Sequence, residues 1–317
     1  MEKFHIKKIS EINEKKLKEF YFKAFNFQKE IIDDHFWRYR SGHNNFEPLA
    51  LIIEDKICGH AGLIPVDIKI NNKIEKSIWF TDFFIQKNYR SMGYGKILTE
   101  SWMKICPTQI TLCNEKSLKI FKKLNWSHNR NFIQKKKIFN YLNIMPIFKN
   151  SKSFDSTIAK NNERFEVENV NNKIISKLID ISEKKIACQK TALVRDENWF
   201  KWRIIDCPYK KNIFILRYKE KYIVIHILKK NNLKRLNIIF TSEDINPELL
   251  GLLTIFSKKN DIDYLSFVEK KNKFIDGFLP GQRKLNFAFY SNDPLTITEL
   301  KQNLSDIQYI DSDIDFI

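Results

Sequence analysis

Apolar residues recur along the first part of the chain with two different periods. At residues 11–25 they return every three or four positions, which predicts a helix with one buried face. Residues 48–54, 57–70 and 74–85 are rich in β-branched and aromatic residues, which favours three strands in a meander. Asn71-Asn72 falls between the last two segments and predicts a tight turn.

Helical and extended patterns then alternate. We expect a helix at 95–105, a strand at 108–113, a helix at 115–124 and a strand at 126–139. The order of helix, antiparallel strands, helix, strand, helix and strand predicts a mixed α/β (α+β) fold with a mainly antiparallel sheet.

The second part of the chain repeats this order. The expected elements are a helix at 172–189, strands at 212–217, 221–229 and 234–240, a helix at 247–258 and a strand at 263–268. Asn246-Pro247 supports the second of these helices, because proline is favoured in a first helical turn.

An eight-residue segment occurs twice, and the first residues of its copies are 33 and 196. Asp33 to Arg40 (DDHFWRYR) and Asp196 to Arg203 (DENWFKWR) agree in charge, aromatic or polar character at each position. Alternating apolar segments follow both copies, at Leu49 to Ile53 and Ile213 to Leu216. The repeat indicates two similar halves.

We place these halves at residues 1–148 and 165–317, joined where Asn, Ser and Lys cluster at 145–165. The Trp and Arg residues of the repeated segment favour packing of a helix on the sheet, with a lining for a substrate groove as the alternative. These residues are Trp37, Arg38, Arg40, Trp199 and Arg203.

The composition of the 317 residues is that of a globular protein with a formal net charge of +17. Such a charge favours an anionic partner, although lysine-rich composition alone also produces a solvated basic surface. The five cysteines form no CxxC pair, which fits reduced thiols in a cytoplasmic protein, and no metal site is expected. We expect no signal peptide and no membrane-spanning helix, because no run of 18 apolar residues occurs.

Two of the eight glycines lie in one turn between a strand and a helix. The strand Trp79 to Ile85 leads through residues 86–89 into Arg90-Ser91-Met92-Gly93-Tyr94-Gly95-Lys96. The first N–H groups of a helix are unpaired and carry partial positive charge, so they bind phosphate. Glycine lets the backbone turn sharply and approach the anion closely. The segment therefore predicts a phosphate-binding turn, to which Arg90 and Lys96 add positive charge.

Two common phosphate motifs do not fit this turn. A dinucleotide-binding fingerprint requires a third glycine where Leu98 stands, and a P-loop requires Ser or Thr where Ile97 follows Gly95-Lys96. The pattern Arg/Gln-x-x-Gly-x-Gly/Ala instead resembles the pyrophosphate loop of the GNAT acyltransferases. Asn114 to Trp126 is similar to the closing pattern of that family, with Asn125 in place of glycine.

The resemblance covers residues 33–132 and implies that acetyl-CoA is the co-substrate. It implies that the backbone of Phe83, Phe84 and Ile85 binds the pantetheine arm where two strands splay apart. It also implies that Asn114 contacts the coenzyme near the thioester. The implied pyrophosphate loop consists of Arg90, Ser91, Met92, Gly93, Tyr94, Gly95 and Lys96.

Acyl transfer from a thioester to an amine requires a neutral amine, a polarised carbonyl and a stabilised thiolate. The resemblance implies that backbone N–H groups near Phe84 or Ile85 polarise the carbonyl. Asp82 is a candidate general base, with a solvent-facing strand residue, or one that pairs with a nearby lysine, as the alternative. His60 is a second candidate, with a structural histidine as the alternative.

Phe121 stands where many GNAT proteins carry the tyrosine that protonates the leaving thiolate. We interpret Cys113 as a buried strand thiol rather than a nucleophile. The second half lacks a phosphate turn, since Thr241 to Asn246 contains two acids and no glycine. We therefore expect it to have lost coenzyme binding and to brace or complete the acceptor site.

The expected function is N-acetyl transfer from acetyl-CoA to a small amine, such as an amino sugar or an amino acid derivative, in a ternary complex. Nucleic acid is not an expected partner of such an enzyme. A Fem-type aminoacyl-tRNA-dependent peptidyltransferase is an alternative that suits the net charge of +17, although the glycine turn argues against it. A regulatory protein that binds acetyl-CoA without transferring its acyl group is another.

Overall fold

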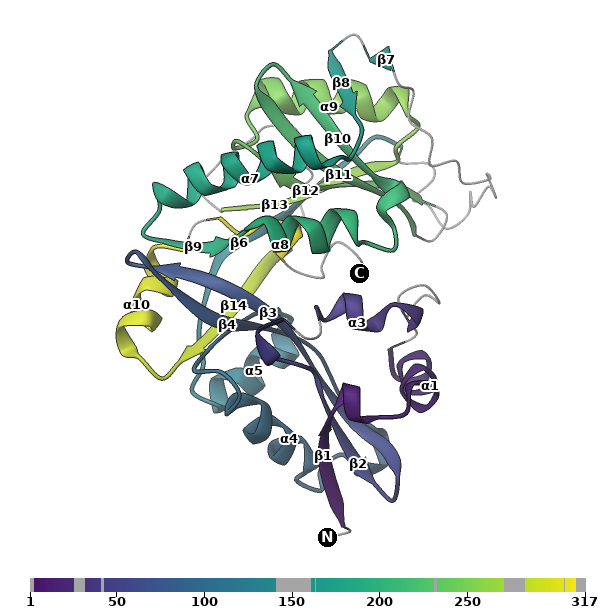
Figure 1. Ribbon diagram of the computed structural model, residues 1–317, viewed down its shortest axis with the longest axis vertical. Coiled ribbons are helices and arrows are strands. Elements are labelled where there is room, and N and C mark those ends of the chain that lie inside the picture. Colours follow the sequence, from purple (N-terminus) through teal and green to yellow (C-terminus); the bar gives the residue numbers. More distant parts are fainter. Residues whose placement is uncertain are drawn as a thin grey trace. The chain divides into compact units, whose positions relative to one another are not determined.

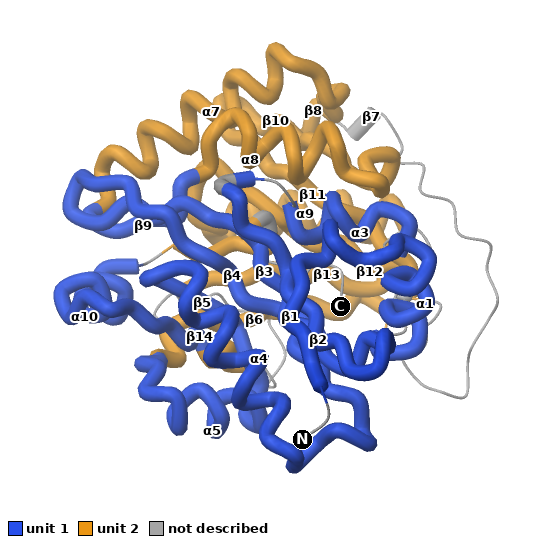
Figure 2. The backbone as a smooth tube through the Cα atoms, turned by 60° about the horizontal axis from the view of Figure 1, so that its bottom comes forward, with its two compact units in different colours: residues 1–128, 190–194, 287–304 blue, residues 129–189, 195–286, 305–317 orange. Residues whose placement is uncertain are grey.

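The computed structural model describes residues 3–25, 32–40, 43–140, 161–162, 164–230, 233–270, 283–304 and 306–311. These residues form two compact units, which Figure 2 colours separately. Unit 1 contains the described residues of 1–128, 190–194 and 287–304, and unit 2 contains those of 129–189, 195–286 and 305–317. Each unit thus takes a segment from the other half of the sequence.

Unit 1 is built on strands in the order β1-β2-β3-β4-β5-β14, and β9 pairs with β3. Strands β1 to β4 pair antiparallel, whereas β4 and β5 are parallel. Their bounds are β1 Phe4–Lys8, β2 Leu49–Ile53, β3 Lys56–Ile70, β4 Lys73–Ile85, β5 Thr108–Cys113, β9 Thr191–Val194 and β14 Arg283–Ser291.

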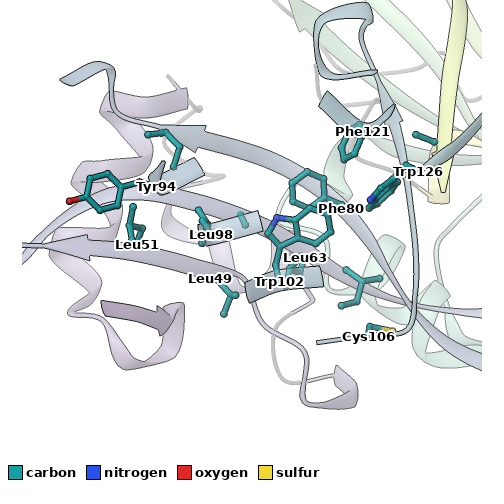
Figure 3. Packing of buried hydrophobic residues seen from close by; sticks show 14 of the residues in the cluster. Leu49, Leu51, Leu63, Phe80, Tyr94, Leu98, Trp102, Cys106, Phe121 and Trp126 are labelled. Carbon is teal, nitrogen blue, oxygen red and sulfur yellow. The ribbon is translucent and has the colours of Figure 1, made fainter. Parts of the chain in front are cut away.

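The helices of unit 1 are α1 Glu14–Phe25, α3 His35–Arg38, α4 Tyr94–Met103, α5 Glu115–Lys123 and α10 Pro294–Gln302, labelled in Figure 1. Buried side chains of α4 and α5 pack on one face of the sheet, as Figure 3 shows. Phe80 of β4 stacks on Trp102 of α4 with ring centroids 4.0 Å apart, and Trp126 packs on Phe121 of α5. This cluster anchors the two helices that border the candidate site.

Unit 2 repeats the arrangement with strands in the order β6-β13-β12-β11-β10-β8-β7. Strands β12 and β13 are parallel, as β4 and β5 are in unit 1. The bounds are β6 Ser127–Ile138, β7 Asn161–Asn162, β8 Phe165–Glu168, β10 Ile213–Tyr218, β11 Lys221–Lys230, β12 Leu233–Thr241 and β13 Tyr264–Lys270, with helices α7 Asn172–Ala187, α8 Glu197–Phe200 and α9 Pro247–Lys259.

The elements expected from the hydrophobic pattern are present, and their ends agree within a few residues. Asn71 and Asn72 both have positive φ, 47° and 69°, as the two central residues of a tight hairpin turn require. Helix α9 begins at Pro247, and the Asn246 side chain accepts a hydrogen bond from the Leu249 N–H. Strands β1, β8, β9 and β14 and helix α10 were not predicted.

The compact units differ from the ranges 1–148 and 165–317 in specific segments. Residues 129–140 belong to unit 2, whereas 190–194 and 287–304 belong to unit 1. Residues 141–160, which include most of the expected junction, lie outside the described residues. Among the described helices, none combines the length and apolarity needed to span a bilayer.

Candidate functional site

Strands β4 and β5 separate partway along their length. Their parallel pairing joins Ile78 to Gln109 and Trp79 to Ile110. At the next position the Thr111 hydroxyl donates a hydrogen bond to the Phe80 carbonyl at 2.7 Å. Beyond that bond lies a cavity of about 180 Å³, bordered by β4, β5, α4 and α5. The splay expected between these strands is therefore present.

The edge of β4 beside this cavity contains a bulge. His60 of β3 pairs with Phe84, and Gly62 pairs with Thr81, so Asp82 and Phe83 have no partner in the register. Asp82 has a positive φ of 46°. Since an extra residue reverses the alternation of side chains, Ile85 after the bulge packs in the same cluster as Phe80 before it. The bulge brings both Asp82 and Phe83 to the cavity wall.

Three donors converge on one oxygen of Asp82. Arg38 donates from Nε and Nη2 to Oδ2 at 3.0 and 2.9 Å, and the Tyr39 hydroxyl donates to the same atom at 3.0 Å. The Arg38 side chain is 4% exposed and that of Asp82 is 12% exposed. In the part of the chain that the structure describes, Oδ1 of Asp82 has no hydrogen-bond partner. Asp82 is also one of the residues that line the cavity.

His60 lies behind the bulge and is fully buried. Its Nδ1 is 3.0 Å from the Asp82 carbonyl oxygen and its Nε2 is 3.1 Å from the Tyr21 hydroxyl. A carbonyl only accepts, so Nδ1 carries the proton and Nε2 accepts from Tyr21. Burial lowers the pKa of His60 to about 4. The ring is thus neutral at pH 7, and neither nitrogen faces the cavity.

The glycine turn opens helix α4. Gly93 is the residue before the helix and has a left-handed backbone, with φ of 87°, which glycine adopts without a steric penalty. Tyr94 and Gly95 begin the helix, and their N–H groups have no acceptor within it. A Cβ on Gly93 would meet nothing within 4 Å, so the space beside this residue is open.

The charged residues of the turn differ in their surroundings. Arg90 is held against the strand, because its Nε donates to the Ile85 carbonyl at 2.8 Å. Lys96 is exposed and lies 3.7 Å from Glu100 one turn along α4. Ser91 and Met92 are exposed, and Ser91 has a positive φ of 65°. The loop from Arg90 to Lys96 therefore presents a positively charged, accessible surface beside the first turn of α4.

Helix α5 closes the far side of the cavity. Asn114 caps it, since its Oδ1 accepts from the Ser117 N–H at 2.9 Å. Ser117 and Phe121 both line the cavity, one helical turn apart. Cys113 also lines it, and burial raises the pKa of its thiol to about 12. A thiol with such a pKa is protonated at neutral pH and is a poor nucleophile.

Of the polar residues around Asp82, Arg38 was predicted to pack a helix on the sheet or to line a substrate groove, whereas Tyr39 and Tyr21 were not predicted. Arg38 and Tyr39 belong to the repeated eight-residue segment, which was interpreted as packing. In the second copy, Trp199 is buried and Arg203 donates to the Tyr309 carbonyl, as a packing role requires. The repeat was the available signal, but nothing in it distinguishes an arginine that packs from one that contacts Asp82.

In the equivalent region of unit 2, residues 306–308 line a cavity of about 250 Å³ together with residues of β12 and β13. Strands β12 and β13 pair only from Arg235 to Asn237 and from Tyr264 to Ser266. Beyond that register, the Gln308 side chain accepts from the Thr241 N–H at 2.7 Å. At the last residue of the register, the Tyr309 hydroxyl lies 2.5 Å from Ser266 Oγ. Residues 306–311 thus contact both strands beside this cavity, whereas unit 1 has no such segment between β4 and β5 among its described residues.

A glycine turn at a helix start beside two splayed strands defines the class of acyl-CoA-dependent acyltransferases with a mixed α/β fold. Residues 11–126 match the profile of the Acetyltransferase (GNAT) family. Over these residues the chain is similar to the GNAT acetyltransferases. No curated protein sequence matches the chain.

Solved structures share the fold over most of the chain. A GCN5-related N-acetyltransferase from Kribbella flavida is 10% identical in sequence and has a TM-score of 0.59. The match covers 90% of this chain and 70% of the Kribbella flavida chain. N-myristoyltransferase from Saccharomyces cerevisiae with bound myristoyl-CoA is 10% identical with a TM-score of 0.58, covering 92% and 83%. A GCN5-related N-acetyltransferase from Anabaena variabilis is 12% identical with a TM-score of 0.59, covering 90% and 72%.

Proposed function

We propose that the chain transfers an acetyl group from acetyl-CoA to the amine of a small molecule, by direct attack in a ternary complex. The observation that carries this proposal is the cavity between the splayed ends of β4 and β5, with Asp82 on its wall. An amino sugar or an amino acid derivative is the class of acceptor that we propose.

The proposed coenzyme site extends from the gap between β4 and β5 to the glycine turn before α4. The backbone of Phe83, Phe84 and Ile85 binds the pantetheine arm as an added strand. The pyrophosphate lies against the N–H groups of the first turn of α4, which carry partial positive charge. Asn114 lies at the cavity wall, where the thioester would be. The loop residues assigned to the pyrophosphate are Arg90, Ser91, Met92, Gly93, Tyr94, Gly95 and Lys96.

Asp82 is the proposed general base. Its Oδ1 takes a proton from the acceptor ammonium, while Arg38 and Tyr39 hold Oδ2. The neutral amine then attacks the thioester carbonyl carbon. The carbon–sulfur bond breaks, and its electron pair leaves on sulfur. The nitrogen loses its second proton, which neutralises the thiolate, so that the products are the amide and free coenzyme A.

Two cavity residues bear on how the sulfur leaves. Phe121 has no proton to donate to the thiolate. The Ser117 hydroxyl lies one helical turn from Phe121 on the same face of α5. It is half-buried, has no hydrogen-bond partner among the described residues and is the candidate proton donor to the thiolate. The protonated Cys113 thiol favours direct transfer over an acyl-enzyme intermediate.

Thermal unfolding with and without acetyl-CoA is the first test. A ligand that binds only the folded state at about 100 times its Kd stabilises it by roughly 2.7 kcal/mol. Absence of any Tm shift at millimolar acetyl-CoA would overturn the proposal.

Release of free coenzyme A thiol across a panel of small amines is the second test. Amine-dependent release identifies the acceptor class. The alternative function is a regulatory protein that binds acetyl-CoA without transferring the acetyl group, which Phe121 at the cavity supports. Binding without amine-dependent thiol release would select that alternative.

A further inference from the structure

We propose that His60 is a positioning residue that aims the N–H of Phe83 at the thioester carbonyl oxygen. His60 holds the Asp82 carbonyl on one side of the bulge, and the Phe83 N–H faces the cavity on the other. The inference rests on the proposed acetyl transfer and assigns one backbone donor and one buried side chain to it.

The direction of the Phe83 N–H follows from peptide geometry. In a trans peptide, the carbonyl of one residue and the N–H of the next point in opposite directions. The described chain contains no cis peptide bond. The Asp82 carbonyl points to His60 Nδ1 at 3.0 Å, on the side of β3. The Phe83 N–H therefore points away from the His60 ring, and Phe83 itself lines the cavity between β4 and β5.

Because of the bulge, Phe83 has no partner in the pairing of β3 with β4. Pairing between β3 and β4 stops at Thr81 and resumes at Phe84, and both residues between them line the cavity. A donor fixed in advance at this wall stabilises the negative charge that develops on the thioester oxygen during amine attack. When the tetrahedral intermediate collapses, the oxygen returns its electron pair and the carbon–sulfur bond breaks.

His60 is suited to hold the peptide and unsuited to move protons. Both ring nitrogens have partners, Asp82 on one side and Tyr21 on the other. The side chain is 0% exposed and is surrounded by the rings of Phe20, Phe25 and Tyr39. A substrate proton has no path to either nitrogen, so the role left to His60 is orientation.

The peptide needs such a restraint because Asp82 has a left-handed backbone, which is unfavourable for a residue with a Cβ. The side chain of Asp82 is held by Arg38 and its carbonyl by His60. Gly62 allows this packing, since a Cβ there would lie 2.8 Å from the Tyr39 ring and 2.9 Å from the Thr81 carbonyl oxygen.

Two substitutions at one position test the proposal. His60→Asn keeps an N–H donor close to the position of Nδ1, whereas His60→Leu keeps the bulk and removes the donor. Loss of a preorganised donor typically lowers kcat by about 10²- to 10³-fold. Here the Phe83 donor is misaligned rather than deleted, so we expect His60→Leu to lower kcat by roughly 10- to 100-fold with little change in the KM for acetyl-CoA. His60→Asn should recover most of the lost rate.

A matched control is His226→Leu, which removes another fully buried strand histidine, in unit 2. It should leave kcat unchanged. Equal kcat values for wild type and His60→Leu would overturn the inference. An equal decrease of kcat in His60→Asn and His60→Leu, together with a changed acid limb of the pH–rate profile, would also overturn the inference. That result would identify His60 as the base.

The infrared carbonyl stretch of bound acetyl-CoA labelled with ¹³C at the carbonyl gives a direct readout. A donor to the carbonyl oxygen lowers this frequency in wild type and His60→Asn, and the shift should be smaller in His60→Leu. The same frequency in all three proteins would contradict the inference while leaving acetyl-CoA binding intact. A wild-type protein that binds no acetyl-CoA would instead refute the proposed function, and this inference with it.

Discussion

Arg38 and Asp82 form a buried ion pair in which two nitrogens of the guanidinium group donate to a single carboxylate oxygen. Nε and Nη2 of Arg38 lie 3.0 and 2.9 Å from Oδ2 of Asp82. Tyr39 adds a third donor to that oxygen. The arrangement fixes the orientation of the carboxylate through Oδ2, and Oδ1 has no hydrogen-bond partner among the described residues.

Asp82→Asn should abolish most of the acetyl transfer while acetyl-CoA binding persists. The amide keeps the shape of the side chain but cannot accept the ammonium proton, and loss of a general base typically lowers the rate by about 10²- to 10⁴-fold. Asp55→Asn, in an exposed turn where Asp55 also has positive φ, is the matched control and should be fully active. A kcat for Asp82→Asn within roughly tenfold of wild type would contradict the assignment.

The first turn of α4 gives a separate prediction for coenzyme binding. Gly93→Glu places a carboxylate where the pyrophosphate is proposed to lie, so acetyl-CoA should no longer raise the Tm. Gly251→Glu introduces the same side chain in helix α9, where a Cβ meets nothing within 4 Å, and should bind normally. Because positive φ at Gly93 also strains any other residue, Gly93→Asn controls for the backbone. Retained binding in Gly93→Glu would exclude this turn as the site.

The segment from β4 to α5 was predictable because its signals are local. Asn71-Asn72 and the glycine turn each specify a backbone conformation within a few residues. Strand β5 was expected at 108–113 and is observed at Thr108–Cys113. Periodicity and turn chemistry are enough to position such elements.

The surroundings of Asp82 were not predictable because they depend on residues that are far apart in the sequence. Arg38 and Asp82 are 44 residues apart, and their contact depends on how α3 meets the bulge in β4. The exchange of β14 and β9 into unit 1 likewise depends on long-range pairing. His60 was considered as a base because its ordinary pKa is suitable, and only the structure shows the burial that lowers the pKa to about 4.

Cys113→Ala should remain active. The thiol lines the cavity, but burial raises its pKa to about 12, so almost none is thiolate at neutral pH. We expect kcat within about threefold of wild type, the change attributable to lost packing in the cavity wall. Intact-protein mass spectrometry after mixing with acetyl-CoA should show no acetylated enzyme. An acetyl adduct that disappears in Cys113→Ala would establish transfer through the cysteine instead.

Burial of His60 also predicts acid sensitivity of the fold. Its folded-state pKa of about 4 lies below the ordinary value of 6.5, so the unfolded chain binds the proton more readily. The free energy of unfolding should therefore fall as pH drops from about 6.5 to about 4, by up to about 3 kcal/mol from this residue. His60→Asn should be less stable than wild type at pH 7 and should show a shallower decline. Denaturant titrations at several pH values test this, and parallel curves for the two proteins would contradict it.

The two units should differ in coenzyme binding, with one acetyl-CoA bound per chain. In unit 2, Gln308 and Tyr309 bridge β12 and β13 where the strands would have to admit the pantetheine arm. That segment is anchored by Arg195, which donates to Asp311 at 2.6 Å and to Asp306 at 2.9 Å in a buried ion-pair cluster. Removing one member of such a cluster is strongly destabilising, so displacement by acetyl-CoA is not expected. Isothermal titration calorimetry should give a stoichiometry near one for wild type and no binding for Gly93→Glu. A stoichiometry of two, or residual binding in Gly93→Glu, would mean that unit 2 retains a coenzyme site.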